Sequence, residues 1–120
     1  MGRDGTRNKE QAMVRITTLY QNTEGAHFDF DYYVDTHLEL IRQRMEGAGL
    51  VGMEVIKGMS NPDGSPAEHL CIFHIYFTTL EAGLRGIEQH GEEFAADIVN
   101  YTNIEPQVQI GAVVHRYTAS

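Results

Sequence analysis

The segment Phe28–Met45 has the apolar pattern of an amphipathic helix. Apolar and aromatic side chains recur there at steps of three and four residues, so they share one helix face, which we expect to pack against a sheet. Asp29 suits the N-cap position, and Gly47 with Gly49 is typical of a helix end. The inward face comprises Phe30, Tyr33, Val34, His37, Leu38, Ile41 and Met45.

A second helix is expected in the second half of the chain. The segment Thr78–Glu81 has the spacing of a capping box, in which a threonine and a glutamate satisfy backbone N–H groups at a helix start. Apolar residues keep helical spacing over residues 80–98, and the helix is predicted to stop near Asn100. Gly86 and Gly91 within it predict a kink or a local break.

Four segments have the composition and alternation of β-strands. The second of them contains Gly52 and Gly58 and is predicted to be an edge or bulged strand. Pro106 restricts the last one to an edge or a strand start. The third is apolar on both faces, which is typical of a central strand covered on both sides. The four segments are Met13–Tyr20, Leu50–Met59, Glu68–Phe77 and Asn103–His115.

The order of elements, β-α-β-β-α-β, predicts an α+β ferredoxin-like fold, with a four-stranded antiparallel sheet and two helices on one face. The other sheet face is then bare, although the strand Glu68–Phe77 is apolar on that side too. A second copy of the chain could cover it, so we expect a homodimer that forms a dimeric α/β barrel. The alternative is that the polar arm or tail of the chain folds over this face.

Length and composition predict a single domain over residues 13–115. Residues 1–12 are polar and are predicted to form a disordered N-terminal arm, and residues 116–120 a C-terminal tail. The formal net charge of −8 argues against nucleic acid and anionic membranes as partners. No apolar run reaches the length of a membrane span, and a single cysteine, Cys71, without an export signal favours a cytoplasmic location.

Tyr33 and His37 are the first candidate functional pair, because they stand one helical turn apart on the inward face. Either they act as general acid and base beside a pocket, or they satisfy one another within a core. His74, on the central strand, either lines a cavity or is a hydrogen-bonded core residue. We expect Tyr33, His37 and His74 to line one mostly apolar cavity between the first helix and the sheet. The candidate ligand-binding residues are His74, Tyr20, Phe30 and Tyr76.

The sequence contains no motif that indicates a metal or a nucleotide. None of the six histidines has a metal-ligand spacing with another ligand on one face. The glycines form neither G-x-G-x-x-G nor a P-loop, and no G-x-S-x-G is present. We therefore predict no metal site and no cofactor.

The first helix carries a motif that resembles a known family. Phe28-Asp29, Tyr32-Tyr33 and His37-Leu38 resemble the F-D-x-x-Y-Y-x-x-x-H-x-P motif of the EthD family, which is named for ethyl tert-butyl ether degradation. One position departs from it, since Glu39 stands where the family usually has proline. This difference adds a carboxylate near the helix centre.

The resemblance extends over residues 13–114, and further segments follow in the family's order. It implies a dimeric barrel of ferredoxin-like subunits and a role in oxidative degradation beside a cytochrome P450 system. Related small barrels act as cofactor-free monooxygenases, polyketide cyclases, decarboxylases and lactone isomerases. The further similar segments are Leu19-Tyr20, Cys71–His74 and Asp97–Pro106.

Two functions follow as hypotheses. The first is a cofactor-free enzyme acting on a small hydrophobic or aromatic molecule, in which His37 moves a proton and Tyr33 or His74 holds an oxyanion. The second is a non-catalytic protein that binds a small ligand, or an accessory protein of an oxygenase system. The enzyme requires a perturbed histidine in an enclosed pocket, whereas the binding protein requires only the pocket.

Overall fold

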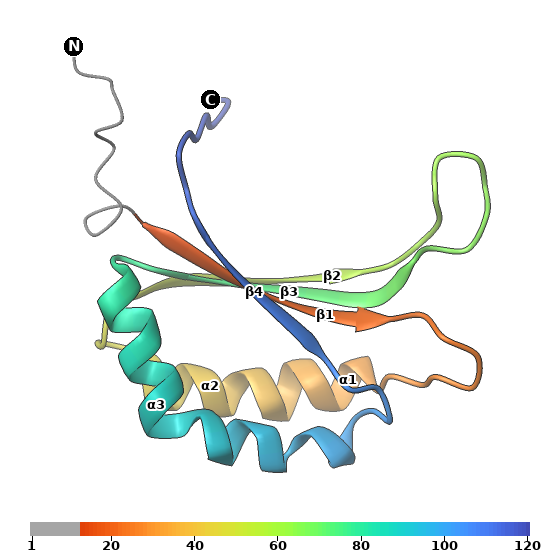
Figure 1. Cartoon of the computed structure of the whole chain (residues 1–120), viewed down its shortest axis with the longest axis horizontal. Coiled ribbons are helices and arrows are strands. Elements are labelled where there is room, and N and C mark those ends of the chain that lie inside the picture. Colours follow the sequence, from red (N-terminus) through yellow and green to blue (C-terminus); the bar gives the residue numbers. More distant parts are fainter. Residues whose placement is uncertain (1–12) are drawn as a thin grey trace.

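The computed structural model describes residues 13–120, which form one antiparallel sheet with the helices on one of its faces (Figure 1). The predicted α+β ferredoxin-like fold is confirmed, whereas the predicted arm of residues 1–12 lies outside the described residues. The strands are β1 (Val14–Gln21), β2 (Leu50–Lys57), β3 (His69–Phe77) and β4 (Gln107–Ala112). The helices are α1 (Phe30–Tyr32), α2 (Leu38–Met45) and α3 (Leu80–Ala96), with a π-helical turn (Tyr33–His37) after α1 and a 3₁₀ turn (Ile98–Asn100) after α3.

The strands lie in the order β2-β3-β1-β4, so β1 and β3 are central and β2 and β4 are the edges. The edge positions of β2 and β4 are those predicted from their glycine and proline residues. β2 also carries an irregularity, because its register with β3 shifts between Leu50 and Gly52. β3 pairs with β1 on one side and β2 on the other, as its two apolar faces predicted.

The hydrophobic core lies between the helices and the sheet face that they cover. Because successive strand residues point to opposite faces, the buried positions show which side of β3 meets the helices. That side is the one that carries Cys71, Phe73, Ile75 and Phe77. The core members on the other elements include Val14, Ile16, Tyr20, Tyr33, Leu38, Ile41, Met45 and Tyr101.

The first helix is interrupted by the π-helical turn, which Leu38 N–H closes by donating to the Tyr33 carbonyl. Tyr33 and His37, at the two ends of this turn, are both buried. Val34 is 48% exposed, so its predicted place on the inward face is wrong. The wider turn keeps Tyr33 and His37 against the core and leaves Val34 in solvent. The Asp29 N-cap is confirmed, since its side chain accepts a hydrogen bond from Tyr32 N–H.

The start of α3 differs by one residue from the predicted capping box. Thr79, not Thr78, is the N-cap, and its hydroxyl accepts from Ala82 N–H at 3.1 Å. Glu81 points outward and forms an ion pair with Arg85 instead. The helix continues without a break through Gly86, and Figure 1 shows it bending along its length.

The sheet face opposite the helices carries His74 and Tyr76 together with neighbouring side chains of β1 and β2. The C-terminal segment and the loop between β2 and β3 both rise on this side of the sheet (Figure 1). Within residues 13–120, no helix is long and apolar enough to cross a membrane.

Candidate functional site

A cavity of about 430 Å³ lies between the helices and the sheet, within the size range of small-molecule sites. Every strand except β2 contributes to its wall, as do the π-helical turn, α2 and α3. Most of the lining is apolar, and the polar groups come chiefly from Tyr20, Tyr33, His37 and Tyr101. The apolar lining residues include Ile16, Ile41, Met45, Phe73, Ile75, Phe77, Ile87, Phe94, Ile98 and Val108.

Among the side chains that line this cavity, His37 forms a hydrogen bond with a carboxylate. Its Nδ1 lies 2.9 Å from Oδ2 of Asp97, at the C-terminal end of α3. An ionised carboxylate can only accept, so Nδ1 carries the proton and Nε2 keeps its lone pair. Nε2 has no hydrogen-bond partner within residues 13–120. Every fully buried side-chain nitrogen or oxygen in these residues has a partner, so Nε2 is not fully buried and keeps some accessible surface. Nε2 is therefore open to the cavity that His37 lines.

The pKa of His37 is lowered, because burial disfavours the imidazolium more strongly than the Asp97 hydrogen bond and charge favour it. The ring is therefore neutral at pH 7 and able to accept a proton. When it does, the Asp97 carboxylate stabilises the resulting cation. This arrangement is that of a general base whose tautomer is fixed by a carboxylate.

Asp97 is held by three donors. The hydroxyl of Tyr32 donates to its Oδ1 at 2.6 Å, Asn100 Nδ2 donates to the same oxygen at 2.9 Å, and His37 occupies Oδ2. Burial raises the pKa of Asp97, but these hydrogen bonds outweigh it and leave the pKa below its usual range. The carboxylate therefore stays ionised at neutral pH. Sequence reasoning did not select Asp97, although it begins the segment Asp97–Pro106 that resembles a family motif.

Two tyrosines pack against His37, and a third, Tyr20, contacts both of them. Tyr33 stacks on its ring, with centroids 5.2 Å apart and an interplanar angle of 16°, and the Tyr101 centroid lies 4.7 Å away. The hydroxyls of Tyr20 and Tyr101 share a hydrogen bond of 2.8 Å. Burial is the main cause that raises the pKa of all three phenols, so they remain protonated and can donate hydrogen bonds.

Of the six candidate residues chosen from the sequence, the structure brings three together in the cavity: Tyr20, Tyr33 and His37. Phe30 does not line it. Its ring packs against Phe28, 4.6 Å away between centroids, and lies under the Lys57 ammonium group. Sequence reasoning missed Tyr101, which also lies in the segment resembling a family motif.

The prediction that His74 shares this cavity is wrong, because His74 and Tyr76 lie on the opposite sheet face. The pattern could not show this, since both sides of β3 are apolar. His74 Nδ1 is within 2.9 Å of the Thr17 hydroxyl across the β1–β3 pair. Burial and the nearby Arg15 charge lower the pKa of His74, and Glu54 opposes them.

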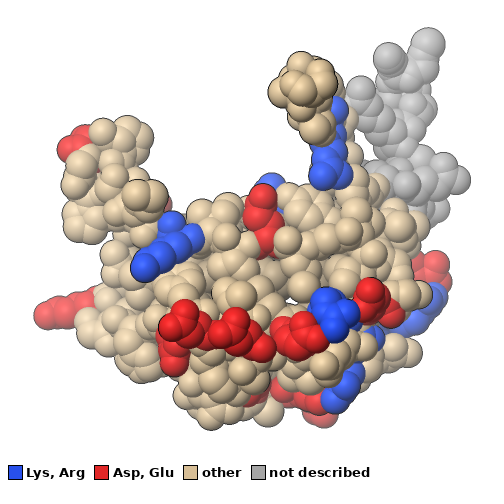
Figure 2. All heavy atoms as spheres, turned by 180° about the vertical axis from the view of Figure 1, so that it is seen from behind, with Lys and Arg blue, Asp and Glu red and all other residues tan. Residues whose placement is uncertain are grey.

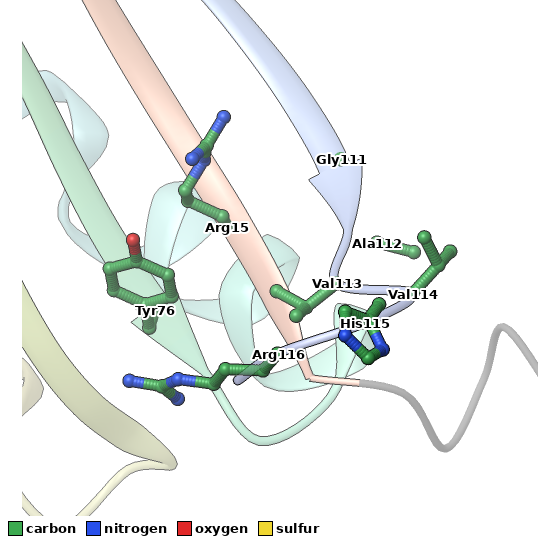
Figure 3. Close-up of a pocket in the computed structure, with 8 residues that line it drawn as sticks. All are labelled: Arg15, Tyr76, Gly111, Ala112, Val113, Val114, His115 and Arg116. Atoms are coloured by element: carbon green, nitrogen blue, oxygen red, sulfur yellow. The ribbon is translucent and has the colours of Figure 1, made fainter. Parts of the chain in front are cut away.

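Tyr76 borders a shallow cleft of about 350 Å³ on the same face, formed with Arg15 and residues 111–116 (Figure 3). The guanidinium group of Arg116 lies 5.8 Å from the centroid of the Tyr76 ring. This cleft is formed by the C-terminal segment and the sheet, so it is separate from the cavity beside His37.

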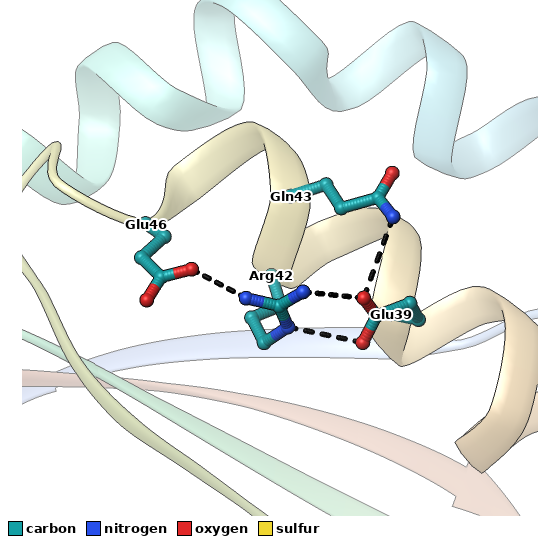
Figure 4. A network of polar contacts seen from close by, with 4 residues as sticks. All are labelled: Glu39, Arg42, Gln43 and Glu46. Atoms are coloured by element: carbon teal, nitrogen blue, oxygen red, sulfur yellow. Dashed lines mark hydrogen bonds and ion pairs between the residues drawn. The ribbon is translucent and has the colours of Figure 1, made fainter.

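Glu39, the residue at the family's proline position, faces away from the cavity. Its carboxylate accepts from Arg42 Nε at 3.0 Å and from Gln43, while the same guanidinium also bonds Glu46 (Figure 4). The Arg42 hydrogen bond is the main cause that lowers the pKa of Glu39. The extra carboxylate therefore bonds to side chains on the helix surface and does not line the cavity.

Comparison with known proteins supports the family resemblance. No family model and no curated protein matches the chain. A solved EthD-like protein from Ralstonia eutropha is 32% identical, with a TM-score of 0.82 over 90% of this chain and 97% of that one. An ethyl tert-butyl ether (EthD) family protein from Bacillus halodurans is 22% identical, with a TM-score of 0.64 over 82% of this chain and 96% of that one.

A third structure, described as a dimeric ferredoxin-like protein from an uncultured marine organism, is 14% identical, with a TM-score of 0.58. It covers 90% of this chain and 100% of its own, and it supports the fold alone. The match to the Ralstonia protein is both above 30% identity and nearly complete in length, and it agrees with the motifs of the first helix. On these grounds the chain belongs to the EthD family.

Proposed function

We propose that the cavity binds a small hydrophobic or aromatic molecule and that His37 removes a proton from it. The observation that carries this proposal is the contact between His37 Nδ1 and Asp97, with Nε2 open to an apolar cavity. A neutral imidazole oriented by a carboxylate is suited to act as a base near neutral pH. Proton removal of this kind begins cyclase, isomerase and cofactor-free oxidation chemistry.

In this reaction an O–H or an activated C–H bond of the ligand breaks, and its proton moves to His37 Nε2. The bonding electrons stay on the ligand as a phenolate or an enolate. Tyr33 is next to His37 and is protonated, and its hydroxyl interacts with that of Tyr20. Rotation of this hydroxyl away from Tyr20 lets it donate to the new oxyanion. The Tyr20–Tyr101 hydroxyl pair offers a second donor on the same side of the cavity. Asp97 holds the imidazolium until the proton is returned.

A second candidate function is a non-catalytic ligand-binding or accessory protein. One observation favours it: the Tyr20 and Tyr101 hydroxyls bond each other, which leaves fewer groups for a reacting ligand. Such a protein needs the apolar cavity but no group that moves a proton. The cytochrome P450 partner and the cytoplasmic location stay predictions from the sequence.

Native mass spectrometry of the purified protein would identify its ligand. This ligand is then used in the assays that distinguish an enzyme from a non-catalytic binding protein. His37→Ala should abolish turnover while the protein stays folded, and the exposed His27, which does not line the cavity, provides the control His27→Ala. A binding protein would bind this ligand but show no turnover in any form, the wild type included. Unchanged binding and turnover in His37→Ala, with only a large loss of stability, would refute a functional role for His37.

We also propose that two copies of the chain pair through the sheet face opposite the helices. Leu19, Ile56 and Ile72 form an apolar row across β1, β2 and β3 on this face. A polar row of Glu54, His74, Thr17 and Gln109 runs beside it across all four strands. A face with both rows suits a self-complementary partner better than solvent.

Sedimentation at micromolar concentration tests the homodimer. The wild-type chain should sediment at twice its monomer mass, and Ile72→Asp should sediment as a monomer because it places a charge in the apolar row. Val99→Asp is a matched control, since Val99 is 80% exposed in the 3₁₀ turn on the helical side. A wild-type monomer would overturn the homodimer and leave the tail as the cover of this face.

A further inference from the structure

The polar groups of the cavity gather at one end, around the π-helical turn. The rings of Tyr33 and Tyr101 lie within 5.2 Å of the His37 ring, and the Tyr20 centroid is 6.0 Å from that of Tyr33. Apart from Thr18 of β1, the side chains of the rest of the wall are aliphatic or aromatic and come chiefly from β1, β3, β4, α2 and α3. The cavity therefore suits a molecule with one polar group and an apolar body.

The charge around the cavity disfavours an anionic ligand. No lysine or arginine is among the lining residues in the described chain, whereas the Asp97 carboxylate lies directly behind His37. Acidic side chains also gather over the helical layer (Figure 2). A carboxylate or phosphate buried here would lose its hydration without gaining a cation.

The tautomer of His37 also decides which polar group fits. Because Nδ1–H donates to Asp97, Nε2 presents only a lone pair to the cavity. A ketone or an ether oxygen has no proton to offer to that lone pair, whereas a hydroxyl group does. The same hydroxyl oxygen can accept from Tyr33 or from the Tyr20–Tyr101 pair.

We propose that the ligand of this cavity is a neutral hydroxylated aromatic or enolic molecule, which binds with its O–H donating to His37 Nε2. This inference rests on the proposed small-molecule site and adds the class of ligand that it selects. Carboxylates and phosphates are excluded from the site, and an apolar ring system without the hydroxyl binds more weakly. Ionisation of the bound hydroxyl gives the oxyanion that the tyrosine hydroxyls receive.

Calorimetric titration with three probes of one shape tests this inference: 2-naphthol, naphthalene and 2-naphthoate. 2-Naphthol should bind about five- to tenfold more tightly than naphthalene, as expected for one buried hydrogen bond. 2-Naphthoate should show no saturable binding. Equal affinities for 2-naphthol and naphthalene, or tighter binding of 2-naphthoate, would overturn the ligand class.

Two variants test whether the preference for 2-naphthol over naphthalene arises in this cavity and depends on His37. His37→Phe keeps an aromatic ring but removes the acceptor, so 2-naphthol should fall to the affinity of naphthalene while naphthalene binding is unchanged. Val108→Trp fills the cavity from a position that is 59% exposed, so it should weaken both probes without unfolding the chain. Thermal melting of each variant checks the fold. If the preference survives in His37→Phe, the assignment to Nε2 is wrong.

The outcomes separate this inference from the proposed function. Selective binding of 2-naphthol without any turnover of the natural ligand would support the ligand class and refute the catalytic role. Tight binding of naphthalene without preference would support the cavity and refute the ligand class. Binding of none of the three probes would refute both the ligand class and the proposed small-molecule site.

Discussion

Replacing Asp97 by asparagine should reverse the tautomer of His37. In the wild-type protein, Asp97 Oδ1 accepts from two donors, Tyr32 and Asn100, and Oδ2 accepts from His37. An asparagine satisfies the two donors only if its carbonyl oxygen takes the Oδ1 position. Its NH₂ group then faces His37 Nδ1 and must donate, so the ring proton moves to Nε2. The nitrogen in the cavity changes from an acceptor to a donor.

The loss of stability in Asp97→Asn can be estimated from the hydrogen bonds whose acceptor is no longer charged. Hydrogen bonds to charged groups contribute roughly 1 kcal/mol more than neutral ones, and Asp97 accepts three. The Asp97 side chain is 15% exposed, so solvent reduces the difference. We expect Asp97→Asn to lower the free energy of unfolding by about 1–2 kcal/mol. The fold should survive, because asparagine keeps the shape of the side chain and all three hydrogen bonds can still form.

Nitrogen-15 NMR of histidine-labelled protein at pH 8 measures the tautomer directly, and urea unfolding measures the stability. The proton should be on Nδ1 in the wild type and on Nε2 in Asp97→Asn, and the preference for 2-naphthol over naphthalene should disappear in the variant. Asp35→Asn, an exposed carboxylate in the same π-helical turn, is the matched control. An Nε2–H tautomer in the wild type would refute both the oriented base and the hydroxylated ligand.

Three further predictions concern stability. The folded-state pKa values of His37 and His74 are lowered, so their neutral forms contribute stability that is present above about pH 6.5 and lost as pH falls. Urea unfolding between pH 8 and 5 should show this decline in stability, and the decline should be smaller in His37→Phe. Gly49→Ala should destabilise by about 1–3 kcal/mol in urea unfolding, because Gly49 has φ +92° and a Cβ there would lie 2.7 Å from Ala82 Cβ. Thr79→Ala should lower the free energy of unfolding by about 1 kcal/mol, whereas Thr78→Ala, at the predicted but incorrect cap, should have a smaller effect.

Local patterns predicted the elements of the fold well. The Asp29 N-cap, the central position of β3 and the edge position of β4 all follow from chemistry that acts over a few residues. The capping box failed by one residue because Thr78 and Thr79 are both good caps, and the choice depends on how the chain leaves β3. Thr78 N–H instead donates to the Gly49 carbonyl, a contact between distant segments that local spacing does not reveal.

The site was only half predictable for a related reason. Tyr33 and His37 stand out because they share a helix face with apolar residues. His74 was misplaced because the two faces of β3 are equally apolar, and only the packing of the helices distinguishes them. Asp97 was missed because its partner is 60 residues away in the sequence. An acidic residue at a helix end is normally a solvated one, and periodicity carries no information about such a contact.

His37 in the helical layer and His74 on the opposite sheet face lie on different sides of the sheet, and this separation has a consequence for function. His37 lies in the cavity on the helical side, and its partner Asp97 belongs to the same layer. His74 lies on the other face and shares a hydrogen bond with the hydroxyl of Thr17 on the neighbouring strand β1. Because the sheet separates the two histidines, substitutions of His37 should change ligand binding without changing the oligomeric state. Substitutions of His74 should change the oligomeric state without changing ligand binding. Coupling between the two histidines would require the backbone of β3 to move, since within residues 13–120 no hydrogen bond of either side chain joins the two sides of the sheet.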